Sequence, residues 1–179
     1  MYNLSNNHIP AHISPHSRSD SNILQAKVSP TRAHLAVNYN SKQIIVFRVS
    51  DQAREIFAAF ECKDTKNRQT KILEFFWLDD IHILLINNTG IEVLLLTQTS
   101  GKTKQFKTIK SISENIRFFV FCSEANAFVC SHESKPGYLF AYTISFKTKG
   151  LLTRGERFSL EIPANEPNVK ADEVFLVLL

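Results

Sequence analysis

The sequence predicts an all-β protein, and three observations carry this prediction. Apolar segments of strand length recur through residues 23–179, and turn-forming Asn, Gly, Ser and Pro lie between them. The composition includes 14 Phe but only five Gly and one Met, which favours a core of aromatic and branched side chains. The 179 residues are 44% hydrophobic, so the chain can form one domain with its own core and is not disordered as a whole.

The most apolar segment, residues 71–96, could be one membrane-spanning helix or several short strands. A spanning helix requires about 20 apolar residues with few charges. The turn sequence Asn87-Asn88-Thr89-Gly90 lies near the centre of this segment, and Asn and Gly tolerate the backbone angles of hairpin turns. Charged or titratable residues interrupt the segment at Glu74, Asp79, Asp80, His82 and Glu92. We therefore predict three strands and no membrane segment.

Similar strand-and-turn sequences lie on both sides of this segment. Each unit contains three strands joined by tight turns and then a longer link to a fourth strand. The strand-like sequences before the segment are ILQAKVS, AHLAVNY, QIIVFRV and REIFAAFEC. Those after it are IRFFVFC, AFVCSHE, YLFAYTI and RFSLEI, with SEAN and SKPG as turns.

The units begin at Leu24, Leu73 and Ile116, which are spaced by 49 and 43 residues. A repeat of about 40–50 residues with four strands each is typical of β-propeller blades. We therefore predict a WD40-like β-propeller of about three antiparallel four-stranded blades and the start of another. The predicted blades are roughly residues 23–67, 71–112 and 115–162, followed by a first strand of a fourth at residues 173–179.

The fourth strand of the second predicted blade differs from the inner strands. Phe106 and Ile109 alternate with polar residues, whereas inner strands such as IHILLIN are nearly continuous apolar runs. The polar residues are Lys104, Gln105, Lys107 and Lys110. Lysines on an exposed outer strand protect it from pairing with other chains, so we place this strand at the outer edge of its blade.

Residues 1–22 have a different composition, rich in Asn, Ser, His and Pro, and show no apolar period. We expect a disordered polar tail. His8, His12 and His16 recur every four residues, but prolines lie between them and would interrupt a helix that aligned them. We therefore expect no metal site in this tail.

The sequence contains no motif that indicates catalysis. Gly101-Lys102-Thr103 resembles the end of a phosphate-binding loop, but Leu96 stands where a second Gly is required and no helix follows. We read Asp79-Asp80 as a turn rather than an acid–base pair, and Trp77 as a core or blade-interface aromatic. We expect no catalytic, cofactor-binding or metal-binding residues and a protein that is not an enzyme.

The three cysteines, Cys62, Cys122 and Cys130, do not match the spacing of a zinc motif. No signal peptide is recognised at the start, so we expect a reducing, cytosolic environment. Cys122 and Cys130 lie within apolar runs and are expected to be free, buried thiols.

The net charge of +4 is modest and does not indicate nucleic-acid binding. Basic segments at residues 63–71, 101–110 and 146–150 fall late in each predicted blade, so they would lie around the outer rim. They could simply keep the edges soluble. Alternatively, they could form a band that contacts an acidic partner or anionic lipid headgroups.

The order of segments resembles the amino-terminal propeller of the Bulli/Mic family, regulatory subunits of the Mon–Ccz guanine-nucleotide exchange complex. The resemblance lies in VSPTRAHLAV, followed by ECKDTKNRQTKILEFFWLDDIHILLINNTGIEVLLL, and later in RFSLEIPANEP. It covers residues 23–179 but only the early part of a family protein. The first blade appears shortened, and the rest of the propeller and the helical region of the family are absent, so we expect a piece of a longer protein or a truncated product.

The resemblance implies a non-catalytic scaffold that supports a Rab exchange factor in late endosome and lysosome trafficking and in autophagy. It implies the Mon–Ccz heterodimer as partner and a cytoplasmic location on late endosome and lysosome membranes. The partner-binding residues are unknown from the sequence. Two alternatives stay open: a divergent WD-type scaffold of a coat or tether complex, and an enzyme with its site in the central channel. The second would need a convergent site on the first strands, which offer only Lys27, Glu74 and Arg117.

Overall fold

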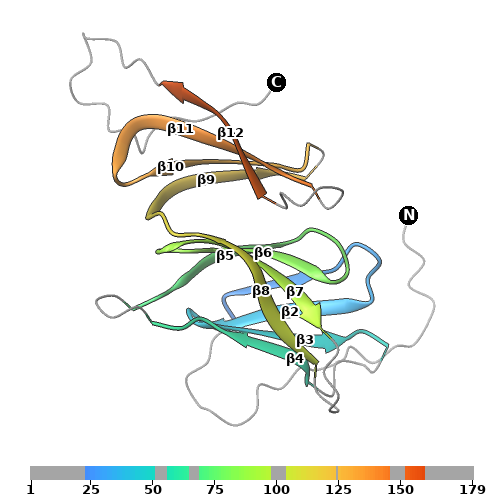
Figure 1. Cartoon of the computed structure of the whole chain (residues 1–179). Helices are drawn as coiled ribbons and strands as arrows, with labels where there is room; N and C mark the ends of the chain where they lie inside the picture. The colour runs from blue at the N-terminus through green and yellow to red at the C-terminus, as the bar shows by residue number, and fades with distance from the viewer. Residues whose placement is uncertain are drawn as a thin grey trace, which may run out of the picture.

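The computed structural model describes residues 23–50, 56–64, 69–97, 104–123, 125–145 and 152–159, and every regular element in these ranges is a β-strand. The strands form three four-stranded antiparallel units stacked in layers (Figure 1). The predicted tail at residues 1–22 and the predicted strand at residues 173–179 lie outside the described residues.

Each unit is a simple up-and-down succession of strands, which we call a blade. The first blade contains β1 (Gln25–Val28), β2 (His34–Asn40), β3 (Gln43–Arg48) and β4 (Ile56–Glu61). The second contains β5 (Ile72–Trp77), β6 (His82–Asn87), β7 (Gly90–Thr97) and β8 (Lys104–Ile112). The third contains β9 (Ile116–Cys122), β10 (Ala127–His132), β11 (Lys135–Ile144) and β12 (Leu152–Ser159).

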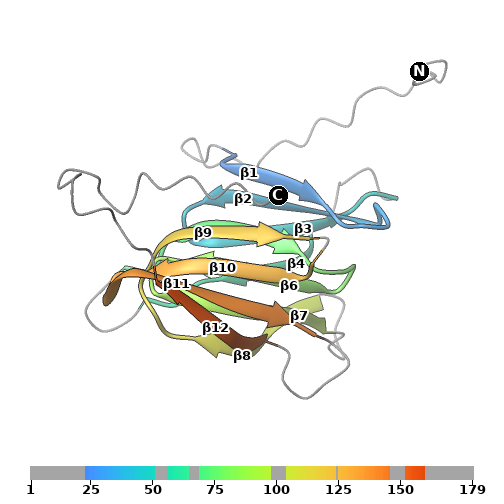
Figure 2. The ribbon, with the colours of Figure 1, turned by 90° about the horizontal axis from the view of Figure 1, so that it is seen from above.

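The first two blades are joined at their outer strands. β4 and β8 run parallel and pair at only two positions, Ala58 with Lys104 and Ala59 with Gln105. This short contact links the blades into one sheet with the order β1-β2-β3-β4-β8-β7-β6-β5, whereas the third blade is a separate sheet. Figure 2 shows β8 and β12, the outermost strands of the second and third blades, along the same side of the molecule.

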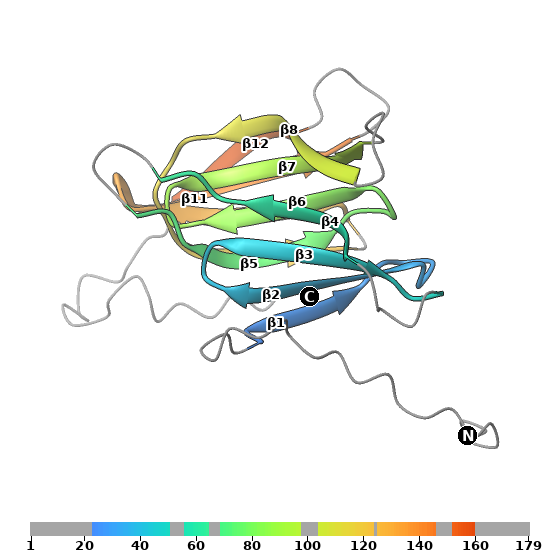
Figure 3. The same cartoon turned by 90° about the horizontal axis from the view of Figure 1, so that it is seen from below.

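The second blade is buried on both faces. Ile83 and Leu85 of β6 point into a core shared with the first blade, whereas Leu84 and Ile86 point into a core shared with the third. All four side chains are inaccessible to solvent, and complete burial of such a side chain contributes about 1.5–3 kcal/mol. The view from below shows the first blade against the second (Figure 3).

This double burial explains why residues 71–96 are so apolar. The segment forms β5, β6 and most of β7, which confirms the prediction of three strands. Asn88 and Thr89 form the turn between β6 and β7, and the Asn87 Oδ1 accepts hydrogen bonds from the backbone and the hydroxyl of Thr89. The described part of the chain has no helix of the length and apolar character needed to cross a membrane.

The third blade differs from the predicted strand limits at two places. β11 begins at Lys135, before the predicted strand, because Lys135 pairs with His132 of β10. A register shift between Ser131 and His132 leaves residues 136–138 without a partner on β10, which suits Pro136 because proline has no N–H to donate. β12 begins at Leu152 rather than near Arg157, because Leu152 pairs with Ile144 and is buried in the core between the second and third blades.

We expect Gly90→Ala to destabilise the protein by about 1–3 kcal/mol, because overpacking a tightly packed site costs this much. A Cβ at position 90 would overlap the carbonyl oxygen of Ile112 on β8, which is backbone and cannot rotate away. Urea unfolding monitored by circular dichroism measures the effect.

Gly155→Ala on β12 is the matched control, because a Cβ there would meet Ala141 only at ordinary contact distances of 3.5 Å or more. It should change stability by less than about 0.5 kcal/mol. Equal destabilisation by the two substitutions would contradict the close β7–β8 approach.

Candidate interaction surface

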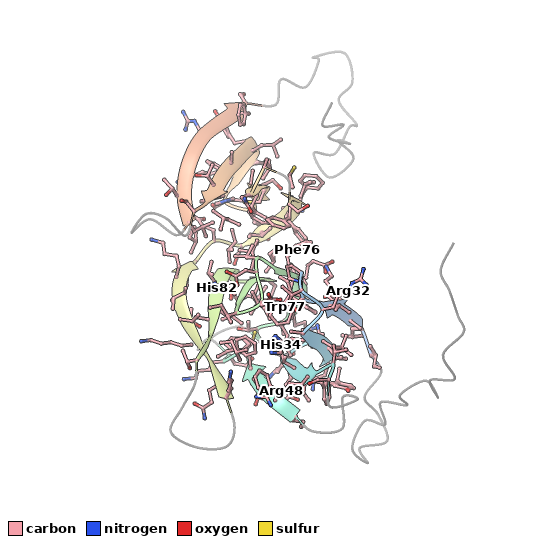
Figure 4. All side chains as sticks on the ribbon, turned by 90° about the vertical axis from the view of Figure 1, so that its right-hand side faces the viewer. Arg32, His34, Arg48, Phe76, Trp77 and His82 are labelled. Atoms are coloured by element: carbon pink, nitrogen blue, oxygen red, sulfur yellow. The ribbon has the colours of Figure 1, made fainter. Side chains whose placement is uncertain are left out.

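Three rings cluster at the seam between the first two blades. The ring of His34, at the start of β2, stacks on Phe57 with 4.9 Å between centroids and lies 6.1 Å from the ring of Trp77. Figure 4 shows His34 and Trp77 next to each other at this seam. The Trp77 Nε1 donates a hydrogen bond of 3.0 Å to the carbonyl oxygen of Lys27 on β1. Trp77 is thus a blade-interface aromatic, as predicted.

A β-bulge positions Phe57, the ring at one end of this cluster. Val46 of β3 pairs with Ala58, and the next residue, Phe47, pairs with Ile56, so Phe57 is the extra residue on β4. Bulges redirect side chains locally. Here Phe57 packs against the core shared by the first two blades, although Ala58, its neighbour in sequence, is also buried there.

Two cationic groups lie over the same ring. The Arg48 guanidinium carbon is 4.3 Å from the centroid of Phe57, and the Lys104 Nζ is 4.6 Å from it. The pKa of His34 is lowered, chiefly by burial and further by the charges of Lys104 and Arg48, while the carboxylate of Asp80 opposes this effect. The seam therefore presents positive charge at the ends of β3 and β8.

Asp79 and Asp80 form a turn, as predicted. The Asp79 Oδ1 accepts hydrogen bonds from the backbone N–H groups of Ile81 and His82, at 2.8 and 2.7 Å. The Asp80 Oδ1 accepts hydrogen bonds from the backbone and the hydroxyl of Thr31, at 3.1 and 2.7 Å. Asp80 thus has a role that the sequence did not show, because it links the β5–β6 turn to the first blade.

The first strands of two blades bring Lys27 and Glu74 together as an ion pair. The Lys27 Nζ lies 2.6 Å from the Glu74 Oε1 and 4.1 Å from the centroid of the Phe76 ring. The carboxylate therefore neutralises the ammonium group, and the ion pair connects β1 with β5 across the blade interface.

A groove opens where β4 and β8 diverge beyond their two paired positions. The rings of Phe60 and Phe106 meet edge to face, with 6.5 Å between centroids, beneath a cavity of about 440 Å³. Its walls are residues 59–61 and 63 of the first blade and residues 104–106 and 108 of the second. Lys63 and Lys104 thus lie on opposite walls.

The predicted basic band is only partly described. Lys107 and Lys110 are exposed on β8, and Arg154 and Arg157 lie on β12. Residues 65–68, 101–103 and 146–150 of the predicted band lie outside the described residues, as does the segment that resembles a phosphate-binding loop. The described portion places three basic residues of β8 along one outer edge.

A polar cluster is buried in the third blade. His132 is 1% exposed, and its Nε2 lies 3.3 Å from the Cys130 Sγ and 3.4 Å from the Tyr142 hydroxyl. On the opposite side of the ring, its Nδ1 lies 3.2 Å from the Glu114 Oε2. The described residues include no group of three or more His, Cys, Asp or Glu that could hold a metal ion. We assign this cluster to packing within the blade.

Cys62 and Cys130 are free thiols, as predicted. Cys62 and Cys130 are buried, and burial raises the pKa of each thiol to about 12. Cys122 is only half-buried, contrary to the expectation of full burial. Its neighbour in space on β10 is Ala127, at the end of the strand where the β9–β10 turn admits solvent.

No local sequence pattern predicts that His34 and Phe57 join Trp77 in a ring cluster, or that a groove lies between β4 and β8. Both depend on ring contacts between residues about 20 to 50 positions apart, and the ring cluster also depends on the bulge at Phe57. The alternation of Lys and apolar residues on β8 and the interface position of Trp77 could be recognised from the sequence.

The arrangement of blades defines the class of protein, a β-propeller. The β-propeller domain of Cps50 (Swd1) from Myceliophteria thermophila superimposes with a TM-score of 0.53 at 9% identity, over 74% of this chain and 39% of that one. A protein from Lactobacillus plantarum gives a TM-score of 0.56 at 12% identity, over 74% and 40% of the two chains. A periplasmic gluconolactonase from Pseudomonas aeruginosa gives 0.54 at 13% identity, over 78% and 40%. At these identities the likeness shows the fold alone, and it confirms the predicted fold class.

The sequence identifies the family. Residues 5–103 match the family described as regulator of MON1-CCZ1 complex, N-terminal, and the chain belongs to that family. The human protein named regulator of MON1-CCZ1 complex is 26% identical over 136 residues. These residues cover 76% of this chain but 19% of the human protein. The match confirms the family that the strand sequences resemble.

The buried cluster around His132 predicts a loss of stability at low pH. Burial lowers the pKa of His132 below its ordinary value of 6.5, and burial likewise lowers the pKa of His34. As the pH falls below 6.5, the unfolded chain therefore binds more protons than the folded protein. The free energy of unfolding should decrease by up to about 1.4 kcal/mol per pH unit for each such histidine.

Urea unfolding between pH 7.5 and 5 measures this dependence. His132→Gln should reduce the slope while leaving the contribution of His34, even if it also lowers stability at pH 7.5. A slope that is the same with and without His132 would show that its burial does not couple to protonation.

Proposed function

We propose that this chain is the propeller portion of a non-catalytic regulatory subunit that binds the MON1–CCZ1 heterodimer. The observation that carries this proposal is the family match over residues 5–103. The related human protein, 19% of which is covered by the 136 aligned residues, is named as a regulator of that complex. A stack of rigid blades with several exposed outer strands suits a subunit that holds other proteins in place.

The role of the MON1–CCZ1 complex indicates the cellular process in which the subunit acts. MON1–CCZ1 acts as a guanine-nucleotide exchange factor for a Rab GTPase of late endosomes. The subunit therefore acts in vesicle transport from late endosomes to lysosomes and in autophagy, on the cytoplasmic side of those membranes. It supports the exchange core without carrying out nucleotide exchange itself.

Contact with the membrane is a separate part of the proposal. The exposed Lys107 and Lys110 of β8 lie on the outer side of the second blade, where they can approach anionic lipid headgroups. Each basic residue near such a surface contributes about 1 kcal/mol. Two or three residues give weak attachment, so the membrane contact assists the protein–protein contact rather than replacing it.

A divergent propeller that serves a coat or tether complex is the alternative function. The described blades suit it equally well, because a propeller fold does not specify a partner. The family match favours MON1–CCZ1. The two functions differ in which proteins remain bound to the natural protein, so purification of its complexes distinguishes them.

We expect the endogenous, tagged, full-length protein to retain both MON1 and CCZ1 in near-equal amounts after affinity purification. Quantitative mass spectrometry against an untagged control measures this. Recovery of coat or tether subunits without MON1 and CCZ1 would contradict the proposed function and would support the alternative.

A further inference from the structure

Most of the outer edge of the second blade has no neighbouring strand in the described part of the chain. β8 pairs with β7 from Gln105 to Ile112, whereas its opposite edge pairs with β4 only through Lys104 and Gln105. From Phe106 onward this edge has no neighbouring strand among the described residues. Such an edge presents backbone N–H and C=O groups that can pair with another extended chain.

The adjoining groove is large enough to hold side chains of such a strand. Its volume of about 440 Å³ lies in the range of ordinary ligand sites, about 300–1,000 Å³. The edge-to-face rings of Phe60 and Phe106 form an apolar floor, and the small Ala59 leaves room beside them. Apolar side chains of an added strand would contact these rings on one face.

The charges around the β8 edge favour an added strand with acidic side chains. β8 has three lysines and no acidic residue, and Lys63 lies on the facing wall. The groove wall includes one carboxylate, Glu61, and the nearby Glu92 accepts a hydrogen bond from the Thr108 hydroxyl. A lysine-rich edge repels a second copy of itself, but the same charges attract an acidic strand.

We propose that the groove between β4 and β8 binds an extended, acidic segment of a protein partner, which adds as a strand to the β8 edge. Its backbone pairs with β8 beyond Gln105. Its apolar side chains contact Phe60 and Phe106, and its carboxylates approach Lys63 and Lys107. The backbone ladder favours a polypeptide over a lipid headgroup, because a headgroup uses the lysines but leaves the ladder unpaired.

The direct test uses the purified full-length protein and two pools of nine-residue peptides. One pool alternates Val, Ile or Phe with Asp or Glu, and the other has Lys in place of every acidic residue. The acidic pool should bind and slow hydrogen exchange of the amides of residues 104–112, and the lysine pool should do neither. Absence of binding by the acidic pool up to about 1 mM, or protection confined to other strands, would overturn the proposal.

Charge reversal supplies the matched variants. Lys63→Glu combined with Lys107→Glu should weaken binding of the acidic pool by about tenfold or more, because both ammonium groups border the edge. Lys71→Glu reverses an equally exposed lysine next to β5, the strand farthest from β8 in its blade, and should leave the affinity unchanged. Equal affinities of the two variants would overturn the proposal.

Vesicles of phosphatidylcholine with phosphatidylserine separate the membrane from the peptide. If the double substitution removed vesicle binding but left binding of the acidic peptides intact, the lysines would serve the membrane and the proposal would be wrong. Recovery of MON1 and CCZ1 is scored separately in the same variants. Binding of acidic peptides and recovery of MON1 and CCZ1 are thus independent readouts. Loss of peptide binding would contradict this inference, whereas failure to recover MON1 and CCZ1 would contradict the proposed function.

Discussion

The second blade is buried on both faces, and this burial holds the three blades together. β6 sends alternate side chains into two separate cores, so each neighbouring blade is held by one face of the same strand. The first blade cannot leave without exposing Ile83 and Leu85, and the third cannot leave without exposing Leu84 and Ile86. Directional contacts add to this packing at the interface of the first and second blades, where Trp77 donates a hydrogen bond to Lys27 and Lys27 pairs with Glu74.

The inner strands hold the blades together, whereas the outer strand β8 stays accessible to other proteins. Inner strands are apolar on both sides, whereas β8 is exposed along much of its length and carries lysines. Stability therefore resides in the centre of the stack, and substitutions at the outer edge can change binding with little effect on folding. A regulatory subunit that docks through an edge needs this separation. The family to which the chain belongs makes MON1–CCZ1 the first partner to test.

The strand order and the burial of β6 follow from local sequence patterns, because turn residues and apolar runs act over a few positions. The role of Trp77 at the interface could also be foreseen. The ring cluster could not, since it depends on the bulge that adds Phe57 to β4 and on charges from β3 and β8. The early start of β12 was missed for a similar reason, because Leu152 is placed by its partner Ile144 rather than by its own neighbours in sequence.

A double-mutant cycle measures whether the second and third blades pack against each other through their faces. The rings of Phe76 and Phe121 lie on different blades with 4.8 Å between centroids. Urea unfolding of Phe76→Leu, Phe121→Leu and the double variant should give a coupling energy of about 0.5–1.5 kcal/mol. Additive effects of the two substitutions, within about 0.3 kcal/mol, would contradict the stacking of these blades.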